Sequence, residues 1–350
     1  MGKVFTVVCR GSWLSLAQVE LFKQKIREVA PEVEIRTTIK ETTGDRNQEI
    51  VLQDLEGKDF FTKDIQDVLL SGAADFAVHS LKDVSGENFF HGNHFAIIDR
   101  DDPRDVAIFK ADVMRKINAN QPLVIGTSSP RRVLMATRFL HEALPTWGGM
   151  RPHIQAKPIR GNVDTRLRKL SDGLFDGVIL AAAGLNRLLR FDQSRNEVAA
   201  LLKSKKIMIL PLLECPPAPS QGAIVAETTH GNTEAVNLLQ KVNQPALILA
   251  AQRERDFAKQ YGSGCHQQFG VVHVNSTYGS FTFGAGVFND QGTSKAFSEY
   301  RYEQPHKRPT TILNASEYFF EKQQPLVIDK KKHAIVVDTE RVILNSEPDH

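Results

Sequence analysis

The sequence predicts an α/β fold of two lobes with a cleft between them, followed by a small α+β domain at the C-terminal end. Two observations carry this prediction. Short runs rich in β-branched and aromatic residues alternate with segments of helical spacing in residues 4–80 and again in residues 123–191. After a longer helical segment, three runs typical of antiparallel strands occupy residues 271–302.

The composition agrees with a globular protein of more than one domain. The chain has 350 residues, of which 41% are hydrophobic and 24% are charged, so it can bury a sizeable core and divide into two or three domains. No apolar stretch approaches the length of a membrane span, and the first residues run directly into a strand pattern without the apolar core of a signal peptide. We therefore expect a cytoplasmic protein.

The first lobe is expected to begin with a strand at residues 4–9 and a helix that follows Ser12. Leu14, Ala17 and Leu21 recur at helical spacing after this serine, and Gly72 ends a second amphipathic pattern. The other elements expected here are strands at 33–39 and 75–79 and a helix containing Phe61, Ile65, Val68 and Leu69.

The second lobe follows a polar crossing at residues 101–105 that contains Pro103. Its expected elements are strands at 123–127, 154–159 and 175–181 and helices at 131–142, 162–171 and 183–191. A Pro-rich run ending at Ser220-Gln221-Gly222 indicates a hinge that returns the chain to the first lobe. The last part is expected to contain a helix at 246–261 and strands at 271–274, 280–287 and 295–302.

These elements predict three domains: residues 1–100 with 220–242, residues 104–207, and residues 244–350 with an unassigned tail. The fold class is thus two periplasmic-binding-protein-like lobes with a cleft, plus a small α+β C-terminal domain. In open α/β sheets the ligand binds at the carboxyl ends of strands, so the segments that follow strands should face one cleft. These segments are Arg10–Ser12, Ser80–Asp83, Thr127–Arg132 and Arg160–Asn162.

Positive charge is concentrated in the second lobe. Residues 124–190 contain nine Arg and two Lys against four acids, a net charge of +7, while the whole chain carries only +3. This favours a local anion site over general binding of polyanions. The stretch also lacks a recognition-helix motif and interleaved stacking aromatics, so no nucleic-acid partner is expected.

Residues 127–132, Thr-Ser-Ser-Pro-Arg-Arg, place hydroxyls and guanidinium groups together at a strand end. Hydroxyls, backbone N–H groups and Arg side chains are the donors that bind carboxylates and phosphates. An ordinary helix start with Ser caps explains the same residues equally well.

Asp83 ends the segment that begins at His79 and lies next to Lys82. A carboxylate in an Arg-lined cleft can stabilise a developing cation or move a proton, and the alternative is an Asp that caps the next turn. Cys265 lies between a glycine and a histidine, where an imidazole can raise the thiolate fraction. Taken alone, this lone cysteine is better explained as a small buried hydrophobe, as are Cys9 and Cys215.

The chain is expected to hold no metal and no disulfide framework. Its three cysteines are scattered without a C-x-x-C pair, and the two histidines of residues 90–94 have no Cys or carboxylate partner at a recognised spacing, which favours a surface loop. Before the second helix, Lys58 and Phe61 could form a lid over the ligand, or Phe60 and Phe61 could pack the helix onto the core.

Taken together, eleven segments in the same order resemble the hydroxymethylbilane synthase family, also called porphobilinogen deaminase, from about residue 5 to about residue 302. They are Arg10-Gly11-Ser12, Thr43-Gly44-Asp45, Lys58–Phe61, His79–Asp83, Asp102–Asp105, Gly126–Arg132, Arg160–Val163, Thr165–Leu167, Ala183–Leu185, Gln221–Ala223 and Gly264-Cys265.

The resemblance implies a transferase of tetrapyrrole and heme biosynthesis that condenses four porphobilinogen molecules head to tail, releases ammonia at each step and yields hydroxymethylbilane. It implies a dipyrromethane cofactor joined by a thioether to Cys265, and a catalytic Asp83 that stabilises cationic pyrroles and assists proton transfer. The residues implied to hold cofactor or substrate are Arg10, Ser12, Lys58, Phe61, Ser80, Lys82, Thr127, Ser128, Ser129, Arg131, Arg132, Arg160, Gly161, Arg166, Arg187 and Gln221.

The implied chemistry agrees with the excess of arginine, because every pyrrole unit brings an acetate and a propionate and a growing chain needs fixed cations. Two departures from the family pattern are Asp59, where Gly is usual, and His266–Phe269 in place of apolar and Pro residues. A non-catalytic binder of an anionic small molecule on the same hinged scaffold is the alternative. The protein is expected to be a monomer.

Overall fold

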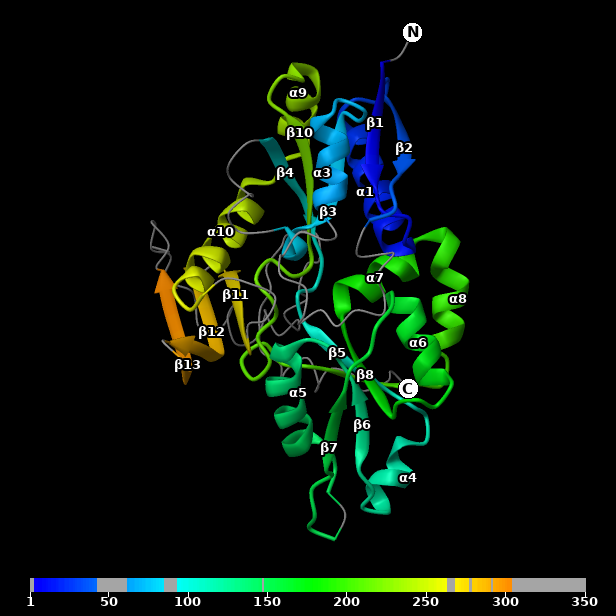
Figure 1. Cartoon of the computed structure of the whole chain (residues 1–350), viewed down its shortest axis with the longest axis vertical. Helices are drawn as coiled ribbons and strands as arrows, with labels where there is room; N and C mark the ends of the chain where they lie inside the picture. Colours follow the sequence, from blue (N-terminus) through cyan, green and yellow to red (C-terminus); the bar gives the residue numbers. More distant parts are fainter. Residues whose placement is uncertain are drawn as a thin grey trace, which may run out of the picture.

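The computed structural model describes residues 3–42, 62–84, 93–146, 148–262, 268–276, 279–290 and 292–303. These residues form two α/β lobes, each with a five-stranded sheet, and a smaller part with a three-stranded sheet (Figure 1). In Figure 1 the first lobe lies above the second, and the third part lies beside both. The predicted α/β class with two lobes and a small α+β part is confirmed.

The first lobe has the strand order β2-β1-β3-β10-β4, in which β10 runs antiparallel to both of its neighbours. Its strands are β1 (Val4–Cys9), β2 (Glu34–Ile39), β3 (Phe76–Ser80), β4 (Asn93–Arg100) and β10 (Ala223–Thr229). Its helices are α1 (Trp13–Val29), α3 (Lys63–Leu70) and α9 (Thr233–Val242). Phe22 of α1 meets Phe76 of β3 edge to face, with ring centroids 5.1 Å apart, and both are fully buried, which fixes α1 on the sheet.

The second lobe repeats this arrangement with the strand order β7-β6-β8-β5-β9, in which β5 is the antiparallel strand. Its strands are β5 (Asp105–Phe109), β6 (Leu123–Gly126), β7 (Ile154–Lys157), β8 (Gly177–Ala181) and β9 (Lys206–Ile209). Its helices are α4 (Val113–Asn118), α5 (Pro130–Ala143), α6 (Val163–Ser171), α7 (Ala182–Arg190) and α8 (Asp192–Leu202). The carboxyl ends of the parallel strands carry the segments that face the first lobe.

Two crossings join the lobes. Residues 101–104 connect β4 to β5, and residues 210–222 connect β9 to β10. Each crossing therefore leads directly into the antiparallel strand of the next sheet, β5 in the second lobe and β10 in the first. The predicted crossing at 101–105 and the predicted return at Ser220–Gly222 both lie at these connections, although Asp105 is already the first residue of β5.

The third part consists of α10 (Pro245–Lys259) and the antiparallel strands β11 (Gln268–Ser276), β12 (Gly279–Asp290) and β13 (Thr293–Glu303). Phe257 of α10 packs on β12 at Gly284, where a Cβ atom would lie only 2.3 Å from the ring. The other end of α10 packs on the first lobe, because Leu247 and Ala251 share a buried cluster with Leu81 of that lobe. α10 thus contacts both the small sheet and the first lobe.

Every strand and helix placed by the sequence pattern is present at nearly the expected bounds. The elements that the pattern did not locate are β4, β5, α4, α8, β9, β10 and α9. The surface loop expected at 90–94 is wrong for its last two residues, because Asn93 and His94 begin β4. Across the described ranges, no helix has the length and apolar character needed to cross a membrane.

Candidate active site

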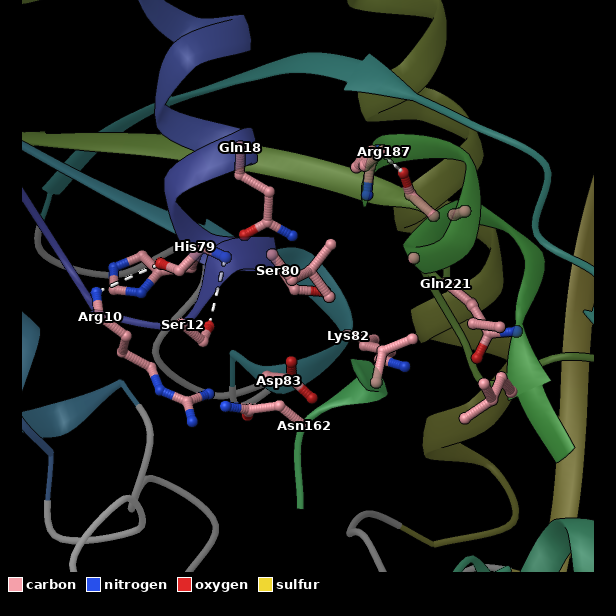
Figure 2. Close-up of a pocket in the computed structure, with 18 of the residues that line it drawn as sticks. Arg10, Ser12, Gln18, His79, Ser80, Lys82, Asp83, Asn162, Arg187 and Gln221 are labelled. Atoms are coloured by element: carbon pink, nitrogen blue, oxygen red, sulfur yellow. Dashed lines mark hydrogen bonds between the residues drawn. The ribbon is translucent and has the colours of Figure 1, made fainter. Parts of the chain in front are cut away.

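A cavity of about 280 Å³ lies between the lobes and collects residues from the ends of β1, β3 and β8 and from the starts of α1, α6 and α7 (Figure 2). The first lobe contributes Arg10, Ser12, Ser80, Lys82 and Asp83 from the predicted set. The second lobe and its return crossing contribute Arg132, Gly161, Arg166, Arg187 and Gln221. Segments far apart in the sequence therefore meet at one cleft, as the topology predicts.

The Asp83 carboxylate is directed into the cavity by a single 3₁₀ turn, Leu81–Asp83, that follows β3 (Figure 2). Leu81 and Val84 point into the core and are at most 4% exposed, so Lys82 and Asp83 are left on the cavity side. Among the described residues that line the cavity, Asp83 is the only acid. No hydrogen bond or ion pair joins its carboxylate to another residue in the described part of the chain, and Figure 2 shows this side chain among the residues that line the cavity.

Lys82 lies beside Asp83 on the same turn. Burial lowers the pKa of Lys82 from its usual 10.5, and the nearby charge of Asp83 opposes that shift. Arg131 and Arg132 act in the same direction as burial, because like charges disfavour the ammonium. Lys82 is therefore a cation that a carboxylate ligand would stabilise.

The start of α1 forms another part of the cavity wall. Ser12 caps the helix by accepting the N–H of Ser15 at 3.3 Å, and the Ser15 hydroxyl accepts the N–H of Arg10 at 3.2 Å. These bonds fix the backbone from which Arg10 reaches the cavity (Figure 2). Gln18, which is 4% exposed, presents its amide one turn further along the helix.

Ser15 and Gln18 were missed by the sequence reasoning. Together with Ser12 they recur every three residues, so they form a polar row on one face of a helix whose other inward residues are apolar. That row was the signal that could have found them. His79 and Asn162 also line the cavity, and both lie in segments quoted for the resemblance without a role.

Arg131 and Arg132 share one buried carboxylate but differ in position. Arg132 donates to Asp105 Oδ1 at 2.7 Å and to the Ile179 carbonyl at 3.2 Å, and it lines the cavity. Arg131 lies 2.8 Å from Asp105 Oδ2 and donates to the Pro216 carbonyl at 2.7 Å, and it is not among the lining residues. Burial raises the pKa of Asp105, but both guanidinium groups outweigh burial and hold that pKa well below 3.8.

Gln221 and Arg187 tie the return crossing to this network. The Gln221 amide donates to the Pro103 carbonyl at 2.7 Å and to Asp105 at 2.8 Å. Arg187 Nη2 donates to the Gly222 carbonyl and lies 3.3 Å from Asp99. Burial lowers the pKa of Arg187, and the charge of Asp99 opposes that shift.

Gly161 and Arg166 form a small unit at the start of α6. Gly161 has φ +108, a conformation that favours glycine, and its carbonyl accepts the Arg166 Nε–H at 2.8 Å. Burial and, to a lesser extent, the charges of Arg132 and Arg160 lower the pKa of Arg166 to about 10. Arg160 itself does not line the cavity, and its carbonyl accepts Lys169 Nζ at 3.0 Å.

The three hydroxyl residues 127–129 build the turn before α5 instead of lining the cavity. The Ser128 hydroxyl donates to the Ile159 carbonyl at 2.7 Å and accepts the Ile159 N–H at 2.9 Å. Ser129 caps α5 by accepting the N–H of Arg132 at 3.5 Å. The alternative of a helix start with Ser caps therefore describes Ser129, while Thr127 is 2% exposed and accepts the N–H of Ser129 at 3.3 Å.

Three residues of the predicted site, Lys58, Phe61 and Cys265, lie outside the described residues, as do Asp59, residues 43–45 and the tail after 303. Within the described ranges, no group of three or more His, Cys, Asp or Glu residues could hold a metal ion.

The chemistry of the lining residues fits a ligand with several carboxylates, such as a dipyrromethane. Five cations, Arg10, Lys82, Arg132, Arg166 and Arg187, face the cavity together with a single carboxylate. The buried Nε atoms of Arg132 and Arg187 have no hydrogen-bond partner in the described part of the chain. Buried guanidinium N–H groups without a partner are costly, and carboxylate oxygens would satisfy them.

Comparison with known proteins gives one consistent result. Residues 5–237 match the family described as "Porphobilinogen deaminase, dipyromethane cofactor binding domain". A probable porphobilinogen deaminase of Pyrobaculum islandicum is 35% identical over 80% of this chain and 86% of its own length. Porphobilinogen deaminases of Thiobacillus denitrificans and Lachnospira eligens are 35% and 36% identical, over 76% and 79% of this chain and 79% and 86% of theirs.

Among solved structures, a probable amino-acid ABC transporter extracellular-binding protein from Bacillus subtilis aligns with 74% of this chain and 97% of its own. The TM-score is 0.38 and the sequence identity is 11%.

Proposed function

This chain belongs to the porphobilinogen deaminase family and is a hydroxymethylbilane synthase, and we propose that the cavity between its lobes is the place of the reaction. The enzyme condenses four porphobilinogen molecules head to tail, releases ammonia at each step and yields linear hydroxymethylbilane. When bound, the dipyrromethane cofactor of the family supplies the pyrrole end from which the product chain is extended. The observation that carries the placement is Asp83, the one acid among the described lining residues, which include five cations.

Asp83 is proposed as the catalytic carboxylate. Loss of ammonia breaks a C–N bond of porphobilinogen and leaves positive charge on the pyrrole, and the new C–C bond then requires a ring proton to leave. A carboxylate that lines the cavity can stabilise that charge and accept that proton. The neighbouring cations can do neither, because they repel the developing positive charge and are already protonated.

The cations are proposed to bind the acetate and propionate groups. Arg10 and Lys82 reach the cavity from the first lobe, and Arg132, Arg166 and Arg187 reach it from the second. Because carboxylate binding would draw on both lobes, we propose that the two crossings act as a hinge that makes room as the product lengthens. Thr127, Ser128, Ser129 and Arg131 are proposed to support the turn that presents Arg132.

Cys265 is proposed as the point of cofactor attachment. Burial raises the pKa of Cys9 to about 11 and that of Cys215 to about 12, and each is at most 1% exposed. Both are therefore poor sources of the thiolate that forms a thioether. Of the three cysteines in the sequence, Cys265 is the candidate that these constraints leave.

We also propose a division into three domains, residues 1–100 with 220–242, residues 104–207 and residues 244–350, which the membership of the two lobe sheets supports. The protein is proposed to act in the cytoplasm as a monomer. It is also proposed to bind no nucleic acid, because several of its arginines line a cavity or pair with buried acids instead of forming an exposed basic face.

Intact mass and porphobilinogen turnover of the purified full chain test this function. The untreated protein should carry a covalent dipyrromethane and form the bilane with release of ammonia. Cys265→Ala should lose the adduct, Cys215→Ala should keep it, and Asp83→Asn should keep it while turning over about 100-fold more slowly or worse. A chain with no adduct and no bilane would refute the proposal, and ligand binding without ammonia release would favour a non-catalytic binder.

A further inference from the structure

We propose that Arg255, on α10 of the third part, is a positioning residue that holds the Lys82–Asp83 turn in place for catalysis. The inference rests on the proposed role of Asp83. It means that the third part helps to orient the Asp83 carboxylate through Arg255, in addition to its proposed role in holding the cofactor through Cys265.

The hydrogen bonds of the Arg255 guanidinium carry the inference. Nη2 donates to the Leu81 carbonyl at 2.6 Å and to the Val84 carbonyl at 3.0 Å. These two carbonyls stand immediately before and after Lys82 and Asp83 in the chain. One nitrogen atom therefore binds both ends of the segment that presents the two charged side chains.

The turn has little to hold it by itself. It is a single 3₁₀ turn of three residues, and the Val84 N–H that follows it donates to the Leu81 carbonyl at 3.2 Å. Short 3₁₀ segments have poor hydrogen-bond geometry, so their direction depends on tertiary contacts. Here the side chains of Leu81 and Val84 belong to the buried cluster that contains Leu247 and Ala251 of α10. α10 thus holds both the side chains and the carbonyl groups of Leu81 and Val84.

Arg255 is committed to this role by its burial. It is 7% exposed, and its Nε donates to the Ser220 hydroxyl at 3.2 Å. Burial lowers the pKa of Arg255 to about 10, and the charge of Glu254 opposes that shift. The side chain therefore stays a cation at neutral pH, and its bonds to carbonyls are of the stronger, charge-assisted kind.

Glu254, the preceding residue, anchors the helix on its other side. Its carboxylate accepts from Arg100 at 2.8 Å, from the Ser220 N–H at 2.7 Å and from the His273 N–H at 2.8 Å. Ser220 is thus held by both α10 residues, at its backbone by Glu254 and at its hydroxyl by Arg255. The helix consequently fixes the return crossing and the catalytic turn relative to each other.

Loss of the Arg255 bonds should misdirect Asp83 and affect the chemical step more than substrate binding, because four of the five cations that line the cavity, all but Lys82, come from other elements. In the holoenzyme, we expect Arg255→Met to lower kcat by about 100-fold while KM changes by about threefold or less. Arg255→Lys, which keeps a cation that can donate to one or both carbonyls, should recover much of the loss. Intact mass should show the covalent cofactor in each variant.

Two variants on the same helix serve as controls. Arg253→Met removes an exposed positive charge, and Phe257→Leu loosens the buried packing of α10 on β12 without touching the turn. Both should keep kcat within about threefold of wild type. If Phe257→Leu lowers kcat as much as Arg255→Met at an equal loss of thermal stability, the effect is a general loosening of the helix and the proposal is wrong.

Hydrogen exchange of the peptide that covers residues 80–84 tests the placement without relying on activity. Arg255→Met and, to a lesser degree, Arg255→Lys should speed exchange in this peptide more than in β1 or β6. Unchanged exchange there, or a wild-type kcat in Arg255→Met, would overturn the proposal. If Arg255→Met does not fold, Arg255→Lys decides by hydrogen exchange alone: faster exchange than wild type in residues 80–84 supports the proposal, and unchanged exchange there overturns it. If the wild-type protein makes no bilane, the proposed function fails, while the exchange result still decides whether Arg255 holds the turn.

Discussion

The guanidinium of Arg132 donates a 2.7 Å hydrogen bond to the carboxylate of Asp105, the first residue of the chain in the second sheet. The residue that begins this sheet therefore sets the direction of a cation that lines the cavity. Arg131 occupies the second oxygen of the same carboxylate at 2.8 Å. The buried carboxylate of Asp105 therefore contacts both the return crossing, through Gln221, and the cations of the anion site, through Arg131 and Arg132.

Replacing Asp105 by Asn should lower the free energy of unfolding by about 3 to 5 kcal/mol, because it leaves two buried guanidinium groups without a counter-charge. Denaturant unfolding followed by circular dichroism measures this loss. Asp192→Asn, which removes an exposed partner of Arg195, is the control and should change stability by about 1 kcal/mol or less. Equal losses in the two variants would contradict the inference.

The contribution of Asp105 to stability should depend on pH in the acid range. Its pKa in the folded protein lies below the ordinary 3.8, so the carboxylate stabilises the fold fully above that value and loses this effect as the pH falls toward the folded pKa. The difference in unfolding free energy between wild type and Asp105→Asn should be constant from pH 7 to about pH 5 and should shrink below pH 3.8. A difference that holds unchanged to pH 2 would show that Asp105 carries no such shift.

Lys82 should limit activity at alkaline pH. Burial lowers its pKa below 10.5, and only the protonated amine binds a carboxylate, so kcat/KM should fall as the pH rises through the lowered pKa. Lys82→Arg keeps the charge at higher pH and should move the falling limb of the pH profile upward. Lys63→Arg, at the exposed start of α3, should leave the limb in place. An identical limb in all three proteins would exclude Lys82 as its source.

Gly161→Ala should reduce kcat/KM by about 10-fold or more. The residue has φ +108, and an added Cβ would lie 2.7 Å from Thr165 Cγ2, so the carbonyl that positions Arg166 must move. Gly173→Ala is a matched control, since Gly173 has φ +80 with open space around it. Both variants should lose about 1 to 3 kcal/mol of stability to backbone strain, and kcat/KM should fall only for Gly161→Ala.

The two α/β lobes could be predicted from the sequence because the signals that mark their helices and strands come from residues close together in the chain. Ser12 and Ser129 precede apolar residues at helical spacing, and both are N-caps in the structure. The short strand β9 gave no such signal, since it has four residues and two of its apolar side chains, Ile207 and Ile209, are exposed. An exposed edge strand lacks the buried run or the alternation by which strands are recognised.

The site was predictable as a collection of charges but not as a geometry. Arg131 and Arg132 are adjacent in the sequence and share the carboxylate of Asp105, 26 and 27 positions earlier. Only the folded chain shows that Arg132 lines the cavity while Arg131 donates to the Pro216 carbonyl. The hydroxyls of residues 127–129 could serve an anion or a helix start, because both uses require the same donors and acceptors. Arg255 was missed because its partners lie 171 and 174 positions away in the sequence.

The place of β10 has a consequence for biosynthesis. This strand separates β3 from β4 in the first sheet, yet its residues, 223–229, follow the whole second lobe. During translation, the edges of β3 and β4 that pair with β10 therefore remain unpaired until more than a hundred further residues have emerged from the ribosome. The N-terminal lobe cannot mature in the order of its synthesis, and nascent chains shorter than residue 229 expose strand edges that chaperones would need to shield.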